Sequence, residues 1–212
     1  MISKRPYPIA ADTVISAGQL VKLSGGFVTA AATNETTKIL GIAAEMHSGS
    51  ADALDPRSNG DEIMVWDSPD LIFECAAPVI TATGGTAATV VTGSASMAAF
   101  AADDFNGGWL KLRGKAAGST NTDAVGRLRQ ITDFADASGT ETFTVDSGGT
   151  ANAGDTFEVY PPLGFVKGNL DAERTNYVIT GAAALPIKVV GYDFDRGMIR
   201  FAAGLHFLGT ED

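Results

Sequence analysis

Hydrophobic and polar positions alternate most regularly between residues 141 and 160. Phe143 and Val145, and after a turn Phe157 and Val159, would point to one side of an extended chain. A period of two is typical of β-strands, whereas helices repeat every 3.6 residues. We therefore expect two strands with these four side chains on a buried face. The positions between them, expected to face water, are Thr142, Thr144, Thr156 and Glu158.

Two further candidate strands, residues 108–113 and 126–131, precede this pair. Glycine-rich turns separate the four strands, for example Asn106–Gly108 and Ser147–Gly149. Glycine and asparagine tolerate the positive φ angles that tight turns require. Four such strands can bury one face by curling into a small barrel or sandwich.

Short apolar runs outside this module also predict strands. Those between residues 13 and 44 predict a meander, and residues 62–66 and 71–75 predict a hairpin around the polar turn 67–70. A last hairpin is expected between residues 187 and 201, and we expect it to complete the sheet begun by residues 13–75.

The pattern predicts an all-β protein with few or no helices, in which residues 96–102 suit either a linker strand or one or two helical turns. The N-terminal arm should be extended and outside any sheet interior, because Pro6 and Pro8 lack backbone donors. The predicted parts are an arm at 1–10, a discontinuous sandwich- or barrel-like β scaffold at 11–76 and 163–212, and an inserted small β-barrel-like module with an Ala/Thr-rich lead-in at 77–162.

Composition narrows the possible partners. The chain has 212 residues, 15 of them basic and 25 acidic, for a formal net charge of −10. A surface of that sign repels a phosphate backbone, so we expect no nucleic-acid partner. The sequence contains neither a run of about eighteen apolar residues nor the apolar block of a signal peptide. We therefore expect a soluble chain, made in a cytoplasm, with no membrane partner.

Residues that usually carry chemistry are few. Cys75 is the one cysteine, and its alternation with Leu71 and Phe73 predicts a buried structural thiol. His47 and His206 have no companions at metal-ligand spacing, so structural or solvent-exposed roles are favoured and no metal or cofactor is expected.

Paired acidic residues could in principle hydrolyse a glycoside, or in one loop bind calcium. Each pair lies at a turn or strand end, where Asp commonly caps backbone donors, so a turn role is favoured. No Gly-x-Ser-x-Gly nucleophile motif occurs, and we expect no enzymatic activity. An aromatic platform is a further possibility, although core or interface roles are commoner for aromatics in strands. The acidic pairs are Asp61 with Glu62, Asp103 with Asp104, and Asp193 with Asp195; the aromatics are Trp66, Trp109 and Tyr160.

Several segments resemble proteins of tailed-phage virions. The module resembles a small β module of such proteins, and the flanks resemble capsid decoration, or cement, proteins. The resemblance implies a structural protein that binds the outer surface of a phage capsid, with the major capsid protein and its own copies in a homotrimer as partners. A head-fibre or tail-associated module that binds a receptor or glycan is the alternative. The matching segments are Phe105–Trp109, Gly126–Arg127, Ile131–Asp133, Thr142–Val145 and Gly154–Glu158 in the module, and Ile15–Lys22, Ile39–Ala43, Val189–Asp193 and Leu205–Phe207 in the flanks.

The arm is the predicted capsid interface. Lys4 and Arg5 form a basic pair in an acidic chain, Pro6 and Pro8 stiffen the segment, and Tyr7 would supply an aromatic anchor. The alternative is an idle terminus. On the interface hypothesis, deleting residues 2–9 would leave the thermal stability almost unchanged and would weaken capsid binding.

Overall fold

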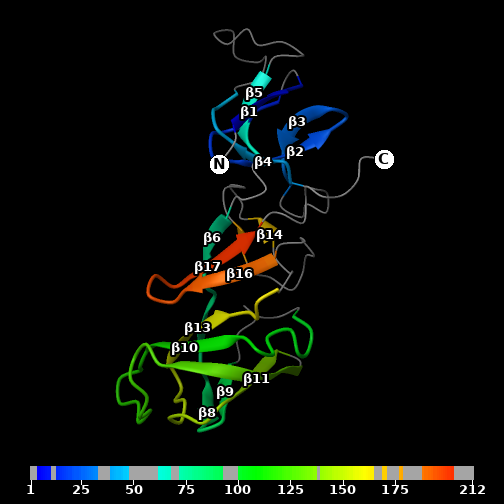
Figure 1. The fold of residues 1–212 in the computed structure, drawn as a ribbon. Coiled ribbons are helices and arrows are strands. Elements are labelled where there is room, and N and C mark those ends of the chain that lie inside the picture. Colours follow the sequence, from blue (N-terminus) through cyan, green and yellow to red (C-terminus); the bar gives the residue numbers. More distant parts are fainter. Residues whose placement is uncertain are drawn as a thin grey trace.

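The structure is a computed structural model that describes residues 4–10, 13–32, 39–47, 62–67, 72–92, 100–137, 139–164, 169–170, 177–178 and 188–202. Every regular element within these ranges is a β-strand, which confirms the predicted all-β class. No helix in the described part of the chain is long and apolar enough to span a bilayer. The strands form three main sheets that follow one another along an elongated molecule (Figure 1).

The first sheet has five strands in the order β1-β5-β4-β2-β3, with antiparallel pairing throughout. A bridge between Ile9 and Val28 joins the two end strands, so the sheet closes into a small barrel. Its interior is aliphatic and includes Ile9, Val28, Ile63 and Val65. The strands are β1 (Lys4–Pro8), β2 (Leu20–Ser24), β3 (Phe27–Ala30), β4 (Gly41–Ala43) and β5 (Glu62–Trp66).

The second main sheet has seven antiparallel strands in the order β7-β13-β10-β11-β12-β9-β8. Only Ala82 and Thr83 separate its two end strands, so the sheet must curl until those ends lie side by side. Register shifts after Leu112 and Ile131 mark bulges, which increase local twist. The result is a second barrel. Its strands are β7 (Val79–Thr81), β8 (Gly84–Thr86), β9 (Thr89–Thr92), β10 (Trp109–Gly114), β11 (Leu128–Ala137), β12 (Thr140–Val145) and β13 (Thr156–Tyr160).

The core of the seven-stranded barrel confirms the face predicted from the sequence. Phe143, Val145, Phe157 and Val159 are all buried. The threonines between them are half-buried rather than fully exposed. Alternation therefore identified the inner face correctly, although the other face of the sheet is only partly open to water.

A three-stranded sheet lies between the barrels, in the order β16-β17-β6. It corrects two pairings expected from the sequence. β5 and β6 do not form a hairpin, because β5 pairs with β1 and β4 whereas β6 pairs with β17. The last hairpin therefore joins β6 and does not complete the five-stranded sheet. The strands are β6 (Ile72–Ala76), β16 (Lys188–Asp193) and β17 (Met198–Ala202), and the short strands β14 (Asn169–Leu170) and β15 (Tyr177–Val178) pair with each other.

Aromatic packing fixes the tip of the β16–β17 hairpin against the outside of the seven-stranded barrel. The Tyr160 ring lies edge-on to Phe194 and Tyr192, at centroid distances of 4.8 and 5.6 Å. The Tyr192 hydroxyl donates to the carbonyl of Pro161 at 2.5 Å. The Lys111 ammonium, which forms an ion pair with Glu158 at 3.3 Å, also donates to the carbonyl of Phe194. This contact explains why the outer face of β10 and β13 is partly buried.

Candidate interaction surface

The N-terminal segment is a strand of the five-stranded barrel, and this changes which of its side chains are accessible. Successive side chains of a strand point to opposite faces. Arg5 and Tyr7 pair in register with Val65 and Ile63, which are fully buried, so their face is the barrel interior. The outer face of β1 and β5 carries the alternate positions, namely Lys4, Pro6, Pro8, Glu62, Met64 and Trp66. We call these six residues the outer face.

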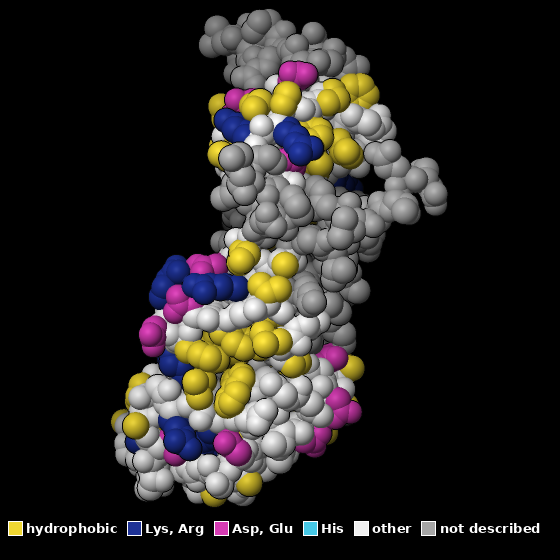
Figure 2. Space-filling model, in the orientation of Figure 1, with side chains coloured by type: hydrophobic (Ala, Val, Ile, Leu, Met, Phe, Trp, Pro, Cys, Tyr) yellow, Lys and Arg dark blue, Asp and Glu magenta, His cyan; other side chains and the backbone are white. Residues whose placement is uncertain are grey.

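The most prominent feature of the outer face is a cation stacked on an exposed aromatic ring. The Lys4 ammonium lies 5.7 Å from the centroid of the Trp66 ring, within the range of a cation–π interaction. Trp66 is 37 % exposed, and Lys4, Pro6, Pro8 and Glu62 are exposed as well. Figure 2 shows Lys and Arg side chains beside hydrophobic and acidic ones over the five-stranded barrel. Tryptophan is a residue type that is enriched at protein interfaces and among their hot spots.

Tyr7 has a different role from the one the sequence suggested. Its ring packs against the aliphatic core, and its hydroxyl donates to Oδ2 of Asp67 at 2.5 Å. Burial, together with the hydrogen bond to this carboxylate, raises the pKa of Tyr7 to about 12. Tyr7 therefore holds β1 to the end of β5 and is not an exposed anchor.

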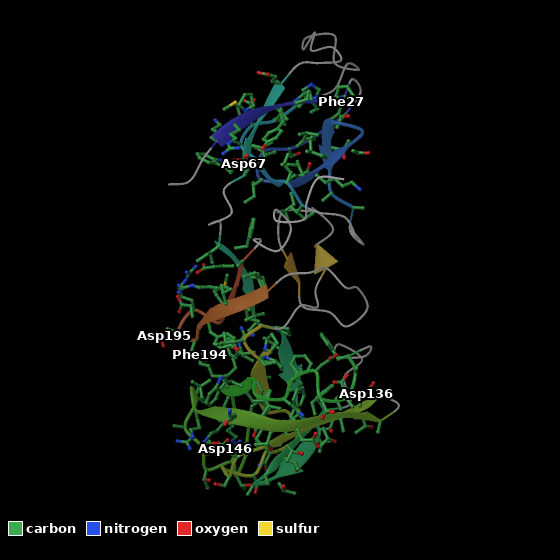
Figure 3. The ribbon with its side chains drawn as sticks, turned by 45° about the vertical axis from the view of Figure 1, so that its right-hand side comes forward. Phe27, Asp67, Asp136, Asp146, Phe194 and Asp195 are labelled. Carbon is green, nitrogen blue, oxygen red and sulfur yellow. The ribbon has the colours of Figure 1, made fainter. Side chains whose placement is uncertain are left out.

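Asp67 is the buried acceptor that organises the interior side of β1 (Figure 3). Besides its hydrogen bond with Tyr7, the Asp67 carboxylate forms an ion pair with the guanidinium of Arg5, with Nε 3.5 Å from Oδ2. The Arg5 side chain itself stays largely exposed, so this pair contributes little to stability but fixes the direction of the arginine. The position of Asp67 directly after an alternating strand is a local signal for it, although the sequence pattern predicts a hairpin turn there.

The backbone beneath Trp66 requires glycine at one point. A Cβ atom built on Gly41 would collide with the carbonyl oxygen of Trp66 and crowd the side chain of Val65. Gly41 therefore allows β4 to approach β5 closely, in the register Ile42 with Trp66. The strand that carries Trp66 is held on both sides, by β1 and by β4.

The acidic pairs act in turns where the structure describes them, as the favoured interpretation held. The Asp103 carboxylate accepts from Nδ2 of Asn106 and the Asp104 carboxylate from the N–H of Ala101, both at 2.7 Å. Asp193 accepts from the N–H of Arg196 at 3.1 Å. Asp195, the other member of the pair with Asp193, is exposed. In the pair of Asp61 and Glu62, Glu62 lies on the outer face and Asp61 lies outside the described residues.

The histidine and cysteine that the structure describes are both structural. His47 is buried, with Nδ1 2.6 Å from the carbonyl oxygen of Thr13, and its backbone bridges Ile15. Cys75 is buried as predicted, and burial raises the pKa of its thiol to about 12. Within the described ranges, no three His, Cys, Asp or Glu side chains are grouped to hold a metal ion. His206 lies outside those ranges.

The three aromatic residues considered as a platform do not form one. Trp66 belongs to the five-stranded barrel, whereas Trp109 and Tyr160 pair across β10 and β13 at the other end of the molecule. Tyr160 is fully buried, and burial and the hydrogen bond to Glu158 raise its pKa far above the usual value. Tyr160 is therefore a core residue.

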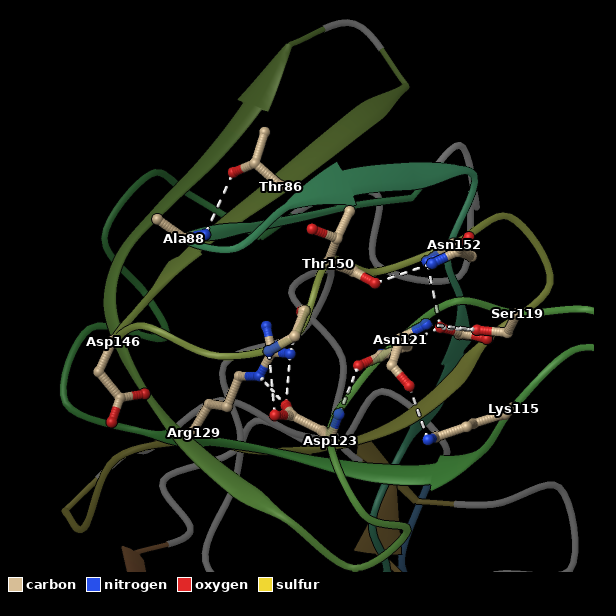
Figure 4. Close-up of polar contacts among 12 residues, drawn as sticks. Thr86, Ala88, Lys115, Ser119, Asn121, Asp123, Arg129, Asp146, Thr150 and Asn152 are labelled. Carbon is tan, nitrogen blue, oxygen red and sulfur yellow. Dashed lines mark hydrogen bonds and ion pairs between the residues drawn. The ribbon is translucent and has the colours of Figure 1, made fainter.

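Sequence reasoning missed two polar clusters inside the seven-stranded barrel (Figure 4). In one, Asp155 accepts hydrogen bonds from the N–H of Ala116 at 3.0 Å, Nδ2 of Asn121 at 3.0 Å and the N–H of Asn152 at 3.1 Å. Burial alone would raise the pKa of Asp155, but these donors outweigh it and the pKa is lowered. The cluster pins the loop after β10 to the loop before β13.

The second cluster is centred on Arg129, whose side chain is buried. Its Nε donates to Asp123 at 2.7 Å and its Nη2 to the carbonyl of Gly149, while the N–H of Gly149 donates to Asp123 at 2.9 Å. A Cβ atom on Gly148 would collide with the guanidinium, so this turn must be glycine-rich. Both clusters are hydrogen-bond networks that link loops, although Nη1 of Arg129 is buried without a partner in the part of the chain that the structure describes, and neither cluster presents a nucleophile with a base.

Comparison with known proteins gives no relative for this chain. No family model matches it, and no curated protein or solved structure matches significantly. The geometry of the chain and the resemblance stated above are therefore the grounds for a functional proposal.

Proposed function

We propose that this protein is a structural virion protein that binds the outer surface of a phage capsid and stabilises the shell by bridging major capsid proteins. The observation that carries the proposal is the Lys4–Trp66 pair on the outer face. It exposes a hot-spot aromatic and a cation at one end of an elongated, acidic, all-β molecule. In this proposal the interface remains at the N-terminal strand, with Trp66 in place of Tyr7 as its aromatic anchor.

The physical demands of capsid stabilisation suit such a molecule. A bound protein that bridges capsomers adds interface area that must be broken before the shell opens, and it stabilises the shell by mass action. This requires rigid β units and recognition surfaces, and no reactive centre. The closed barrels and the aromatic contact at the β16–β17 tip provide rigidity. Synthesis in the host cytoplasm, assembly as a homotrimer and location on the virion surface belong to the same proposal.

The test is a binding titration with capsids of the phage that encodes the chain, assembled without this protein. Wild-type protein should saturate these capsids at many copies per particle and raise the temperature at which they release DNA. Trp66→Ala should weaken binding by tenfold or more, the loss of one hot-spot residue. Trp66→Phe should restore part of it, because the ring is retained.

The matched control is Leu163→Ala, which removes another exposed apolar side chain from the chain segment after β13. It should bind as wild type does, and thermal melts should show that all variants are folded. Wild-type protein that fails to bind these capsids would disprove the proposal. Binding of the isolated protein to host glycans, with no capsid binding, would support the receptor- or glycan-binding alternative.

A further inference from the structure

Two features of β1 restrict how a partner can engage the proposed capsid-binding face. The barrel is closed beyond Pro8, where Ile9 bridges to Val28, but along residues 4–8 the strand is an end strand of its sheet, and its backbone could in principle template another strand. Residues along an antiparallel strand direct their backbone groups alternately to the two sides. Arg5 and Tyr7 have N–H groups to give to β5, whereas Pro6 and Pro8 have none. The backbone groups of Lys4, Pro6 and Pro8 therefore point away from β5.

The free edge of β1 is consequently poor in donors. It offers carbonyl acceptors at three alternate positions but an N–H donor at Lys4 alone. Strand addition depends on main-chain donors and acceptors in alternation, so two missing donors in five residues disfavour it strongly. Directly beyond Pro8, the bridge from Ile9 to Val28 covers the edge.

The charges of the outer face point to the chemistry that the partner offers. Lys4 forms no ion pair with another described residue, because the acid at this end of β1, Asp67, is buried and receives Arg5 and Tyr7 on the opposite face. The Trp66 ring holds the Lys4 ammonium at the surface. Glu62, the acid of the same face, is four positions along β5 from Trp66, about 13 Å at strand spacing. Glu45 lies near as well, since its Oε1 accepts from the N–H of Met64 at 2.9 Å, but Lys4 is the charged side chain of the outer face that lies beside Trp66, in a chain of net charge −10.

We infer that the partner docks by side chains onto the outer face, without adding a strand to β1, and that its segment places a carboxylate against Lys4 and an apolar group against Trp66. This inference rests on the proposed function and names the chemistry of the partner at that site. An ammonium held over an aromatic ring loses little freedom when it forms an ion pair, so its charge favours binding more than that of a mobile lysine.

The same capsid titration tests both parts. Lys4→Glu should weaken binding by tenfold or more, and this loss should shrink at high salt because screening weakens both attraction and repulsion. Lys4→Arg should bind within about twofold of wild type, since arginine also stacks on Trp66 and pairs with carboxylates. Arg113→Glu, an exposed charge reversal on the seven-stranded barrel, is the matched control and should have little effect.

The double variant Pro6→Val, Pro8→Val restores two N–H donors to the free edge while retaining apolar side chains. Side-chain docking predicts unchanged affinity, within about twofold. A gain of tenfold or more would show that the edge accepts a strand and would overturn the inference, and so would wild-type affinity of Lys4→Glu. In either case wild-type binding would leave the proposed function intact. Absence of wild-type binding would overturn the proposed function and this inference with it.

Discussion

The two barrels place their aromatic side chains in opposite ways. In the seven-stranded barrel, phenylalanines pack on one another in the interior, with Phe105 at centroid distances of 4.7 Å from Phe100 and 5.0 Å from Phe134. The interior of the five-stranded barrel is mainly aliphatic; of its aromatic residues, Tyr7 lies at the rim, Trp66 lies on the outside and Phe27 is half-buried in β3. The exposed Trp66 ring, stacked with the Lys4 ammonium, is the feature of this barrel that favours a role in binding.

Their polar interiors differ as well. Asp155 and Arg129 each tie two loops of the seven-stranded barrel together from within. In the five-stranded barrel, Asp67 instead ties the first strand to the end of the last strand, and leaves the outer side of both strands open. The comparison suggests that one barrel is built for rigidity of its loops and the other for presenting a strand face. Four experiments test this contrast, and the two tryptophans make them practical, since each reports on one barrel.

The largest effect is expected from deleting residues 2–9. The structure replaces the earlier expectation of an unchanged melt, because β1 pairs along β5 and Ile9, whose bridge to Val28 closes the barrel, is fully buried. The deletion should abolish the cooperative unfolding transition of the five-stranded barrel, followed by Trp66 fluorescence in a Trp109→Phe background. The transition reported by Trp109, in a Trp66→Phe background, should persist.

The control for this deletion is the double variant Lys4→Ala, Arg5→Ala, which keeps the strand and should melt nearly as wild type does. If the deleted protein retained a wild-type Trp66 transition, β1 would be a dispensable arm and the barrel assignment would be wrong.

A smaller but still large loss is expected for Phe157→Ala. The side chain is 1 % exposed in the core of the seven-stranded barrel, and removing a buried phenylalanine costs about 3–5 kcal/mol of unfolding free energy. Thr156→Ala, one position along the same strand, should cost less than about 1 kcal/mol because its side chain is half-buried and lies on the other face. Denaturant titrations followed by Trp109 would measure both, and equal midpoints would contradict the face assignment.

The inner face predicted at Phe157 was correct and the hairpin predicted at residues 62–75 was wrong, and both outcomes have one physical explanation. Alternation is a local property, so residues 141–160 revealed their inner face from spacing alone. Strand pairing is a long-range property, because the partner depends on where the whole sheet curves. Nothing local distinguishes the polar segment after Trp66, which leads from one sheet to another, from a hairpin turn.

The candidate site was predicted in part for the same reason. The sequence identified the segment Lys4–Pro8 and the donor loss at its prolines, both local features. It could not assign Tyr7 to the interior or bring Lys4 onto Trp66, because the residues that pair between β1 and β5, such as Lys4 with Trp66, are far apart in the sequence. The Arg129 and Asp155 clusters were hidden likewise, since their partners come from separate loops.

Lowering the pH should destabilise the seven-stranded barrel through the carboxylates of its two polar clusters. Burial alone would raise the pKa of Asp123 and of Asp155, but their hydrogen bonds, and for Asp123 also the charge of Arg129, lower both below the usual value near 4. A carboxyl with a lowered folded-state pKa contributes stability above its unfolded pKa, and this stability is lost as the pH falls through the folded-state pKa. The midpoint reported by Trp109 should therefore fall as the pH is lowered below about 4.

Asp155→Asn should flatten part of this pH dependence, because the titrating group is gone. It should also lower the stability at neutral pH, since an amide nitrogen cannot accept the donors that surround Asp155. A variant whose stability retained the full acid dependence of wild type would show that Asp155 is not responsible for it.

The smallest effect is expected for the double variant Asp103→Asn, Asp104→Asn, in the turn that leads into β10. Asp103 has a φ of +70°, a conformation in which asparagine is tolerated nearly as well as aspartate. An asparagine Oδ1 can still accept from Ala101 at position 104, and the site is exposed, so the unfolding free energy should change by less than about 0.5 kcal/mol. Capsid binding should be unchanged, because this turn and the outer face belong to different barrels.

The same variant tests whether Asp103 and Asp104 catalyse a reaction. The unmodified protein should show no hydrolysis of host polysaccharide, since both carboxylates are engaged in turn hydrogen bonds and no nucleophile with a base accompanies them among the described residues. Turnover by the wild type that the double variant abolishes would make this turn a catalytic site, and would reverse the contrast between a rigid barrel and a recognition barrel.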